Sequence, residues 1–495
     1  MGTGVIISGA GPVGLMLAGE LRLAGVDVTV YEKLSGPSGE SRGVGFTRRA
    51  AEVFHQRGLL DRLGEIEIGR QGHFGGVRID FEMLEDNHFG IRGVPQYRIE
   101  EVLEAWVGEL GLSVQRGCEV TGFRETAEGV TALVETPGGS IEHTADYLVG
   151  CDGGRSTIRK AAGIAFPGRE ATRGMYVADV VGCDIPTRAI GERVPGGMVM
   201  AIRLEDDVDR IIIHPDGVPP HDDRSRLTFA EVADSWQSLT GQSLHHAEAR
   251  WVSAFTNATR QAAEYRRGRV FLCGDSTHIH IPAGAQGLSV GVQDAVNLGW
   301  KLAADLQGWA PQGLLDTYHS ERHPVGARLV RNTLAQSSLY LTGEEMEPLR
   351  GIMRELVTFP DAARHLAEMV SGLDVSYEVG DGSHRLLGRR MPDRELKRAD
   401  GSPTRVAELL HAARGLLIHS ADHTEAARTA AGWSDRVDAV AATWAPSADA
   451  EDGQGAVDSV LIRPDGHVVW TSPGGGELAD ALPRWFGPRE HSARR

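Results

Sequence analysis

Three glycines and one carboxylate near the start of the chain have the types and spacing that bind a dinucleotide. Gly9, Gly11 and Gly14 form the pattern G-x-G-x-x-G, and Glu32 follows 18 residues after the last of them. In this pattern the first glycine makes a tight turn, the second lets backbone approach a pyrophosphate, and the third lets a helix pack closely on a strand. The acidic residue accepts hydrogen bonds from ribose hydroxyls. The predicted chemistry is dinucleotide binding.

Two aspartates further along the chain each follow a short apolar segment. Asp152, with Gly153 after it, comes directly after residues 147–150, and Asp275 comes just after residues 269–273. An aspartate in this position is most often a helix cap. In an open α/β sheet, however, ligands bind outside the carboxyl ends of the strands. We therefore expect both aspartates and the glycine-rich turn to converge on one extended ligand.

Hydrophobic periodicity indicates the elements that position these residues. Residues 5–7 read as a short apolar strand, and the apolar residues after the glycines recur at helical spacing up to Ala24. After a turn at Gly25, residues 26–30 alternate as a second strand. Strand, helix, second strand and acid thus follow the order of a nucleotide-binding βαβ unit. The fold class is predicted to be α/β, with a Rossmann-like domain at its centre.

The pattern changes in the middle of the chain and again near its end. Between about residues 175 and 251, strand-like segments alternate with polar turns that contain proline, and a helix is predicted over residues 229–240. This indicates an inserted antiparallel sheet whose face covers the cofactor. From about residue 388 the chain reads as a small α/β unit in the order of a thioredoxin-like fold. It contains no cysteine, which excludes thiol redox chemistry there.

Composition and charge limit the partners. The 495 residues carry a net charge of −17, which argues against binding to nucleic acid or an anionic membrane because phosphate binding needs a basic face. The four cysteines show no C-x-x-C spacing, so neither disulfides nor a zinc site are expected. No basic residue precedes the apolar N-terminus, and no apolar run reaches about 18 residues. We expect a cytoplasmic monomer or homodimer without a membrane span.

Other residues give weaker signals. His278 and His280 would share one face of an extended segment, but the spacing suggests no third ligand. Structural or pocket-lining roles are therefore favoured over metal binding. Arg42, in the loop after the second strand, could bind a nucleotide phosphate or simply be solvated. The large apolar residues that are candidates for a substrate pocket are Phe74, Phe81, Met198 and Met200.

Together the motifs resemble those of a known family. The glycine-rich turn with its acid, the segment DGGRSTIR, and GDSTHIHIPAGAQG followed by DAVNLGWKL look like the three fingerprints of group A FAD-dependent aromatic hydroxylases. These have the para-hydroxybenzoate hydroxylase-type fold. The resemblance covers nearly the whole chain. Segments such as GESRGVGFT, QGHFGG and RPDGHVVW are most similar to bacterial aromatic polyketide hydroxylases of the angucycline type.

The resemblance implies a GR2-type flavoprotein with an inserted substrate domain and a C-terminal thioredoxin-like domain. The expected parts are residues 1–174 (first part of the FAD-binding domain), 175–264 (antiparallel-sheet substrate domain), 265–384 (second part of the FAD-binding domain with a helical connection) and 385–495 (thioredoxin-like domain).

Carried over position by position, the resemblance also implies which residues hold the cofactor. They are Gly9, Gly11, Pro12 and Gly14 at the FAD pyrophosphate, Glu32 at the adenosine ribose, Arg42 and Gln96 near the ribityl-pyrophosphate region, Val120 near adenine, Asp152 and Gly153 toward FAD and the approach of NADPH, Asp275 at the ribitol, and Pro282, Ala285, Gln286, Gly287, Leu288 and Ser289 along the isoalloxazine ring. The last loop precedes a helix, so its amides and the helix dipole can stabilise negative charge on reduced flavin. No catalytic acid–base pair can be assigned from spacing.

Two residues of this loop depart from the family pattern. The family usually reads G-G-Q-G-x-N, whereas this chain has Ala285 in place of the second glycine and Ser289 in place of the asparagine. Alanine restricts a backbone that glycine leaves free, and serine is shorter than asparagine. We expect these departures to affect flavin mobility or the reaction outcome, and not FAD binding itself.

The reaction that the resemblance implies is hydroxylation of a polycyclic aromatic polyketide in antibiotic biosynthesis. Non-covalent FAD would be reduced by transiently bound NADPH, and O2 would form a C4a-hydroperoxyflavin that transfers one oxygen to the ring. Baeyer–Villiger oxygenation shares all these motifs and is the alternative within enzymes. Alternatives of other classes are a flavin-binding protein without turnover and an NAD-binding dehydrogenase; the Asp-Gly and Gly-Asp signals argue against the dehydrogenase.

Overall fold

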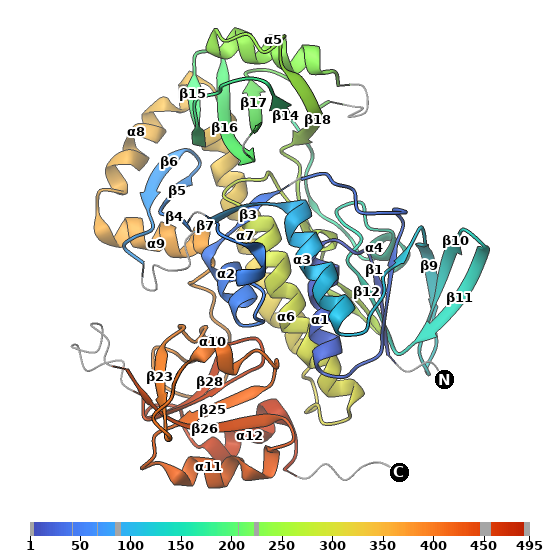
Figure 1. The fold of residues 1–495 in the computed structure, drawn as a ribbon, viewed down its shortest axis with the longest axis vertical. Coiled ribbons are helices and arrows are strands. Elements are labelled where there is room, and N and C mark those ends of the chain that lie inside the picture. Colours follow the sequence, from blue (N-terminus) through green and yellow to red (C-terminus); the bar gives the residue numbers. More distant parts are fainter. Residues whose placement is uncertain are drawn as a thin grey trace.

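The computed structural model describes residues 4–41, 43–66, 68–84, 91–205, 207–221, 227–445 and 457–489. Figure 1 shows a sheet with helix α5 at one end of the molecule, a central α/β body, and a C-terminal unit at the other end. Within the described ranges, no helix combines the length and the apolar character that crossing a bilayer requires.

A six-stranded sheet forms the centre of the molecule, in the order β20-β21-β12-β1-β2-β8. Its strands are β1 (Val5–Ser8), β2 (Val28–Glu32), β8 (Gln115–Arg116), β12 (Tyr147–Gly150), β21 (Val270–Leu272) and β20 (Arg266–Arg267). All neighbours pair in parallel except β20, which lies antiparallel at the edge. Every residue of β1, β12 and β21 is buried, as expected for parallel strands covered on both faces.

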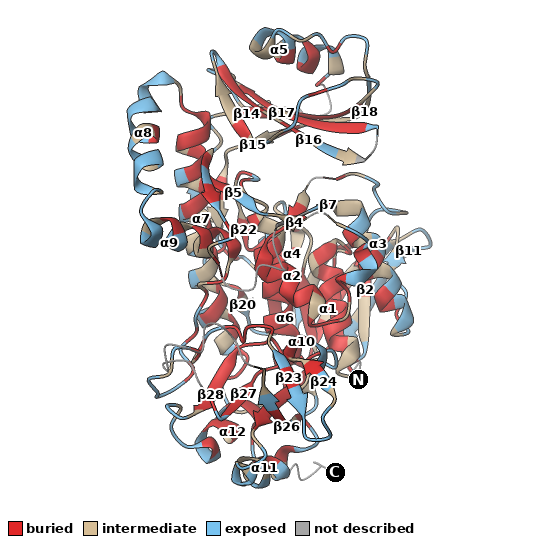
Figure 2. Ribbon diagram, turned by 60° about the vertical axis from the view of Figure 1, so that its left-hand side comes forward, coloured by how far each residue is buried: buried red, intermediate tan, exposed pale blue. Residues whose placement is uncertain are grey.

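Helices cover one face of this sheet and a small sheet covers the other. The helices are α1 (Pro12–Leu23), α3 (Gln96–Glu109), α6 (Gln286–Leu306) and α7 (Asp316–Leu341); the small sheet consists of β9 (Glu119–Glu125), β10 (Val130–Thr136) and β11 (Gly139–Ala145), with α4 (Thr157–Ala161) beside it. Glycine lets the helices approach closely: a Cβ at Gly19 would lie 1.9 Å from the Trp106 ring of α3, and one at Gly299 would lie 2.6 Å from Glu20 of α1. Consequently α6 is buried along almost its whole length (Figure 2).

The inserted sheet has five strands in the order β15-β16-β17-β14-β18, all antiparallel. They are β14 (Gly174–Val181), β15 (Arg188–Val194), β16 (Gly197–Glu205), β17 (Val208–Pro215) and β18 (Glu248–Thr256). Helix α5 (Phe229–Thr240) covers one face, and its start is fixed by a capping box between Thr228 and Glu231. The other face is turned toward the central body (Figure 2).

Shorter elements connect these two parts. They are α2 (Arg48–His55), the sheet β3 (Val44–Phe46), β7 (Ile91–Pro95) and β4 (Ile68–Gly69), the hairpin β5 (Gln71–Phe74) and β6 (Val77–Asp80), the sheet β13 (Gly168–Arg169), β19 (Thr259–Gln261) and β22 (His278–Ile279), and the helices α8 (Glu347–Leu356) and α9 (Pro360–Ser371).

The C-terminal unit contains a second six-stranded sheet, in the order β24-β23-β26-β25-β27-β28. Its elements are β23 (Glu395–Arg398), β24 (Pro403–Arg405), α10 (Val406–Leu409), β25 (Gly415–His419), α11 (Thr424–Ala430), β26 (Val437–Trp444), β27 (Ser459–Ile462), β28 (Val468–Ser472) and α12 (Leu478–Phe486). A parallel pair, β25–β26, continues into the antiparallel strands β27 and β28, which agrees with the predicted thioredoxin-like order.

Candidate active site

The glycine-rich turn between β1 and α1 leaves room for an anion at the start of the helix. A Cβ at Gly9 (φ 106°) would lie 2.5 Å from the Cys151 carbonyl oxygen, and a Cβ at Gly14 would lie 2.0 Å from the Gly9 carbonyl oxygen. At Gly11, the residue before α1, an added Cβ would meet no atom within 4 Å, and no side chain caps the helix. The first amides of α1 therefore face open space, as pyrophosphate binding requires.

Glu32 holds this turn in place. One carboxylate oxygen accepts a hydrogen bond from the Ala10 amide at 2.9 Å, and the other accepts from the Leu34 amide at 2.9 Å. Ala10 belongs to the glycine-rich turn, so the carboxylate stabilises this turn in addition to its predicted role at the adenosine ribose. Because each carboxylate oxygen has a further lone pair, the half-buried side chain can still accept from ribose hydroxyls.

The carboxyl ends of three neighbouring strands bring the predicted aspartates to this turn. The register places Ser8 of β1 opposite Gly150 of β12, and Gly150 opposite Leu272 of β21. Asp275 follows β21 in a short 3₁₀ turn and is exposed. A Cβ at Gly274, just before it, would lie 3.0 Å from Val13 in the first turn of α1.

Asp152 has both a capping role and an unused oxygen. Its Oδ2 accepts from the amides of Thr157 at 2.6 Å and Ile158 at 3.1 Å, which stabilises the start of α4. Its Oδ1 is buried and has no hydrogen-bond partner among the described residues. Gly153 beside it has a φ of 78° and open space at its Cβ position. A buried carboxylate oxygen without a partner is costly unless a ligand satisfies it, so this strand end also fits the cofactor.

Residues 281–289, the flavin loop, include all the positions predicted to lie along the flavin ring, and one of them is strained. Ala285 directly precedes α6 and adopts a left-handed conformation, with φ 55° and ψ 25°. Pro282 is exposed, and the buried Gln286 side chain donates to the Ala283 carbonyl oxygen at 3.1 Å. The substitution of alanine for glycine therefore lies where glycine would be favoured.

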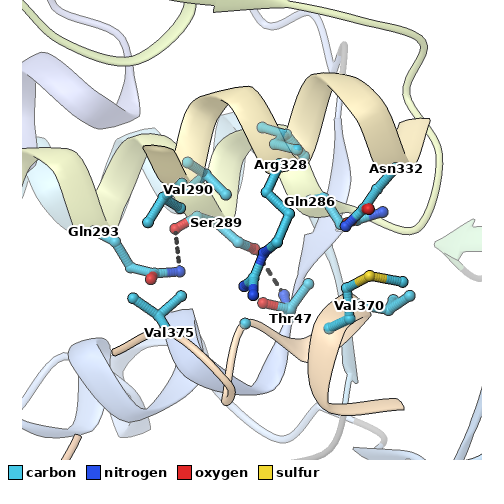
Figure 3. Close-up of a pocket in the computed structure, with 13 residues that line it drawn as sticks. Thr47, Gln286, Ser289, Val290, Gln293, Arg328, Asn332, Val370 and Val375 are labelled. Carbon is cyan, nitrogen blue, oxygen red and sulfur yellow. Dashed lines mark hydrogen bonds between the residues drawn. The ribbon is translucent and has the colours of Figure 1, made fainter. Parts of the chain in front are cut away.

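Ser289 connects the first turn of α6 to Thr47, which is distant in the sequence, through hydrogen bonds. Its hydroxyl accepts from the Thr47 amide at 2.8 Å (Figure 3). The same hydroxyl donates to the Ala285 carbonyl oxygen at 2.9 Å. A cavity of about 20 Å³, room for about one water, lies beside it. Its lining includes two buried atoms, Thr47 Oγ1 and Gln293 Oε1, that have no hydrogen-bond partner within the described part of the chain.

The other residues implied for the cofactor lie around the same sheet edge or in the core. Gln96 begins α3 and accepts from the Gly43 amide at 3.2 Å, so it contacts the loop after β2. Arg42 lies outside the described residues. The Val120 side chain is buried in the core of the central body, on β9.

The face of the inserted sheet opposite α5 contacts the flavin loop through apolar side chains. Met198 and Phe255 of this sheet cluster with Ile281 and Ala283 of the loop and with Tyr340 of α7. The strand register shows which residues share this face. Met198 lies opposite His214, and one step along the sheet Met200 lies opposite Ile212 and Val177 opposite Ser253. Sheet and loop thus form an apolar boundary next to the predicted seat of the flavin ring.

Phe74 and Phe81, the other two pocket candidates, lie elsewhere. They are buried in a separate core with Leu339 of α7 and Val370 of α9. The hairpin that carries them fills the space between helices, so these two rings are structural.

The two histidines of the β22 segment have protein partners. His278 Nε2 lies 3.2 Å from Asp294 Oδ2, and both groups are fully buried. His280 Nδ1 donates to the Ile281 carbonyl oxygen at 2.6 Å, and burial lowers the pKa of this imidazole to about 4. Across the described ranges, no group of three or more His, Cys, Asp and Glu side chains could hold a metal ion.

The fold and this site define a class. The chain matches the FAD binding domain family over residues 2–333 and the aromatic-ring hydroxylase C-terminal family over residues 384–488. It therefore belongs to the FAD-dependent aromatic-ring hydroxylases, which are flavin monooxygenases, and the predicted fold and FAD cofactor are confirmed. NAD(P)H is the typical co-substrate of this family.

Within this class, the similarity to particular members spans the whole chain. CabE, an aromatic hydroxylase from angucycline biosynthesis, is 54% identical; the match covers 99% of this chain and 100% of CabE with a TM-score of 0.94. The 12-dehydrotetracycline 5-monooxygenase/anhydrotetracycline 6-monooxygenase of Streptomyces rimosus is 42% identical over 98% of this chain and 99% of its own. The rifampicin monooxygenase of Streptomyces venezuelae is also 42% identical, over 98% of each chain.

Proposed function

We propose that this chain hydroxylates a polycyclic aromatic polyketide of the angucycline type, using FAD, NADPH and O2. The observation that carries the proposal is the 54% identity to CabE over nearly all of both chains. The structure supports it with an apolar sheet face directly beside the flavin loop. Fused aromatic rings are flat and apolar, and such a boundary suits them because it excludes water from the reacting ring carbon.

The proposed roles of the cofactor residues follow from the geometry. The amides at the start of α1, freed by Gly11, would hold the pyrophosphate, and Glu32 would hold the adenosine ribose. Asp275 would hold the ribitol, and the loop from Pro282 to Ser289 would lie along the flavin ring. FAD, when bound, supplies the electron transfer from NADPH and the activation of O2. The protein positions the ring, and the dipole of α6 favours negative charge at its start.

The substrate would lie on the sheet face that carries Met198, Met200 and Ile212. A charge placed on this face would have to be desolvated when the substrate binds. Met200→Lys is therefore expected to raise KM for the polyketide at least tenfold and to leave the Kd for FAD unchanged. Leu349→Lys, on the exposed surface of α8, is the matched control and should change neither.

The direct test follows NADPH consumption by the yellow holoenzyme in air, with and without a phenolic angucyclinone. Substrate-stimulated consumption and a product heavier by one oxygen support the proposal, and NMR of the product separates ring hydroxylation from Baeyer–Villiger lactone formation. A holoenzyme that binds the angucyclinone and consumes no NADPH would refute the proposal and indicate a flavin-binding protein without turnover.

We further propose that the protein works in the cytoplasm, as a monomer or homodimer, without nucleic acid or membrane partners. The net charge of −17 and the free cysteines, which form no disulfide among the described residues, support this setting. Gel filtration with light scattering decides between the two oligomeric states.

A further inference from the structure

The hairpin turn between β27 and β28 of the C-terminal unit is buried although its sequence is strongly charged. It consists of residues 463–467, Arg-Pro-Asp-Gly-His, and every one of them is buried. Turns normally run over the surface because their backbone polar groups need water. This turn is buried because it enters the FAD-binding part of the chain, whose side chains take the place of water.

Two arginines around α2 satisfy the backbone of the turn. Arg57 donates to the Pro464 carbonyl oxygen at 2.7 Å, and Arg49 donates to the Asp465 carbonyl oxygen at 2.9 Å. Both arginines are themselves buried. The position of the turn is thus fixed by directional, charge-assisted hydrogen bonds from the central body.

The side chains of the turn form an ion network with α6 and α7. Glu321 of α7 accepts from Arg463 at 2.6 and 2.9 Å and from Lys301 of α6 at 2.8 Å. Burial alone would raise the pKa of Glu321, but the charges of Arg463 and Lys301 lower it to about 2. A buried ion network is often no more stabilising than apolar packing of equal volume. Its benefit here is that it allows one geometry between the two units.

From this turn a continuous chain of contacts leads to the flavin loop. The His467 ring lies 4.4 Å from the Tyr377 ring, centroid to centroid. The Tyr377 hydroxyl accepts from Arg322 Nη1 at 2.8 Å. Arg322 Nε in turn donates to Asp294 Oδ1 of α6 at 2.6 Å, and both of these groups are fully buried.

Arg322 and Asp294 hold both ends of the flavin loop. His278, just before the loop, contacts Asp294 Oδ2 at 3.2 Å, and Val290, just after it, accepts from Arg322 Nη2 at 3.1 Å through its carbonyl oxygen. A small shift of the Arg322 guanidinium would therefore move the strand that enters the loop and the helix turn that leaves it.

We propose that the C-terminal unit sets the position of the flavin loop through this chain, with Tyr377 as the positioning residue between the two units. Tyr377 acts through Arg322 and touches neither substrate nor flavin ring. The inference rests on FAD binding and not on the identity of the polyketide. Measurements on bound FAD therefore decide it even if the proposed substrate is wrong.

The test compares two tyrosine-to-phenylalanine variants of the full-length holoenzyme. Tyr377→Phe keeps the ring against His467 and removes the acceptor from Arg322. Tyr147→Phe removes a partly buried hydroxyl that donates to Asp305 at 2.5 Å, near the opposite end of α6. Each variant loses one side-chain hydrogen bond. Only Tyr377→Phe should weaken FAD binding, by about three- to tenfold, within the range of coupling between networked residues, and shift the visible absorption band of the bound flavin.

Two outcomes would overturn the inference: wild-type FAD affinity and flavin spectrum in Tyr377→Phe, or equal changes in both variants. If Tyr377→Phe fails to fold, His467→Ala tests the same link from the C-terminal side. It removes the ring whose centroid lies 4.4 Å from that of the Tyr377 ring. This variant should then show the FAD effect, and a wild-type result would again overturn the inference.

Discussion

Replacing Ala285 by glycine should make this protein more stable, although glycine usually destabilises a folded chain. Ala285 has φ 55° and ψ 25°, and the left-handed conformation costs a residue with a Cβ about 1–2 kcal/mol. Glycine removes that cost. Its greater freedom in the unfolded chain costs about 0.4–1 kcal/mol. The net gain is about 0.5–1 kcal/mol, which corresponds to a rise in Tm of roughly 1–4 °C for a unit of about 150–250 residues.

The assay is thermal unfolding of the apoprotein, with two alanine-to-glycine controls. Ala413, in the C-terminal unit, is the other non-glycine residue with positive φ (50°) among the described residues, so Ala413→Gly should also stabilise. Ala105 is exposed within α3, so Ala105→Gly should destabilise by about 1 kcal/mol. Amide hydrogen exchange at residues 284–287 should become faster in Ala285→Gly alone, because two successive glycines loosen the flavin loop.

The reasoning would be refuted if Ala285→Gly lost as much stability as Ala105→Gly. That result would mean that the residue before α6 is not in the left-handed region. The flavin loop would then be unstrained in this protein, and the departure from the family glycine would have no backbone consequence.

Two further predictions concern FAD affinity and the pH dependence of stability. Glu32→Gln should weaken FAD binding about 10- to 100-fold, because the new NH2 group would face one of the two backbone amides and an acceptor for the ribose would be lost. Titration of the apoprotein with FAD measures this affinity, with the exposed Glu109→Gln as the control, and a change below twofold would contradict the prediction. Burial lowers the pKa of His73 from 6.5 to about 4. As the pH falls, His73 is therefore protonated in the unfolded chain before it is protonated in the folded protein. The free energy of unfolding should decrease between pH 6.5 and pH 4, by up to about 1.4 kcal/mol per pH unit from this group. Urea unfolding at several pH values should show a shallower decline in His73→Gln, and an unchanged decline would argue against a neutral, buried His73.

The parts of the fold that could be predicted are those with a strong local signal. The helix predicted over residues 229–240 is α5, with the same bounds, because a capping box starts it and Gly241, in the left-handed conformation, ends it. In contrast, β11 was not predicted. Its residues are mostly exposed and show no apolar alternation, so only pairing with β10 makes it a strand. The strand β18 was also missed, since its partner β14 lies far away in the sequence. The strand β15 was missed although it forms a hairpin with β16, the next strand.

In the candidate site, too, some features could be predicted from the sequence and others could not. The glycine-rich turn could be predicted because only glycine fits where a Cβ would overlap a carbonyl oxygen, as at Gly14. The sequence also shows that Ser289 departs from the family, but not what its hydroxyl does, because its partner Thr47 is 242 residues away. Phe74 and Phe81 are large and apolar, as residues of a substrate pocket would be. The sequence does not show that they pack against α7 and α9 in a core.

The buried turn at residues 463–467 has a consequence for the order in which the protein is completed during synthesis. Arg49, Arg57, Lys301 and Glu321 all belong to segments made before this turn, which lies about 30 residues from the C-terminus. Until the turn leaves the ribosome, Glu321 lacks Arg463, and Arg49 and Arg57 lack the carbonyl oxygens of Asp465 and Pro464. A buried ion network that has lost some of its members is less stable than the complete one. The junction between the central body and the C-terminal unit therefore cannot reach its final form until this turn has been translated.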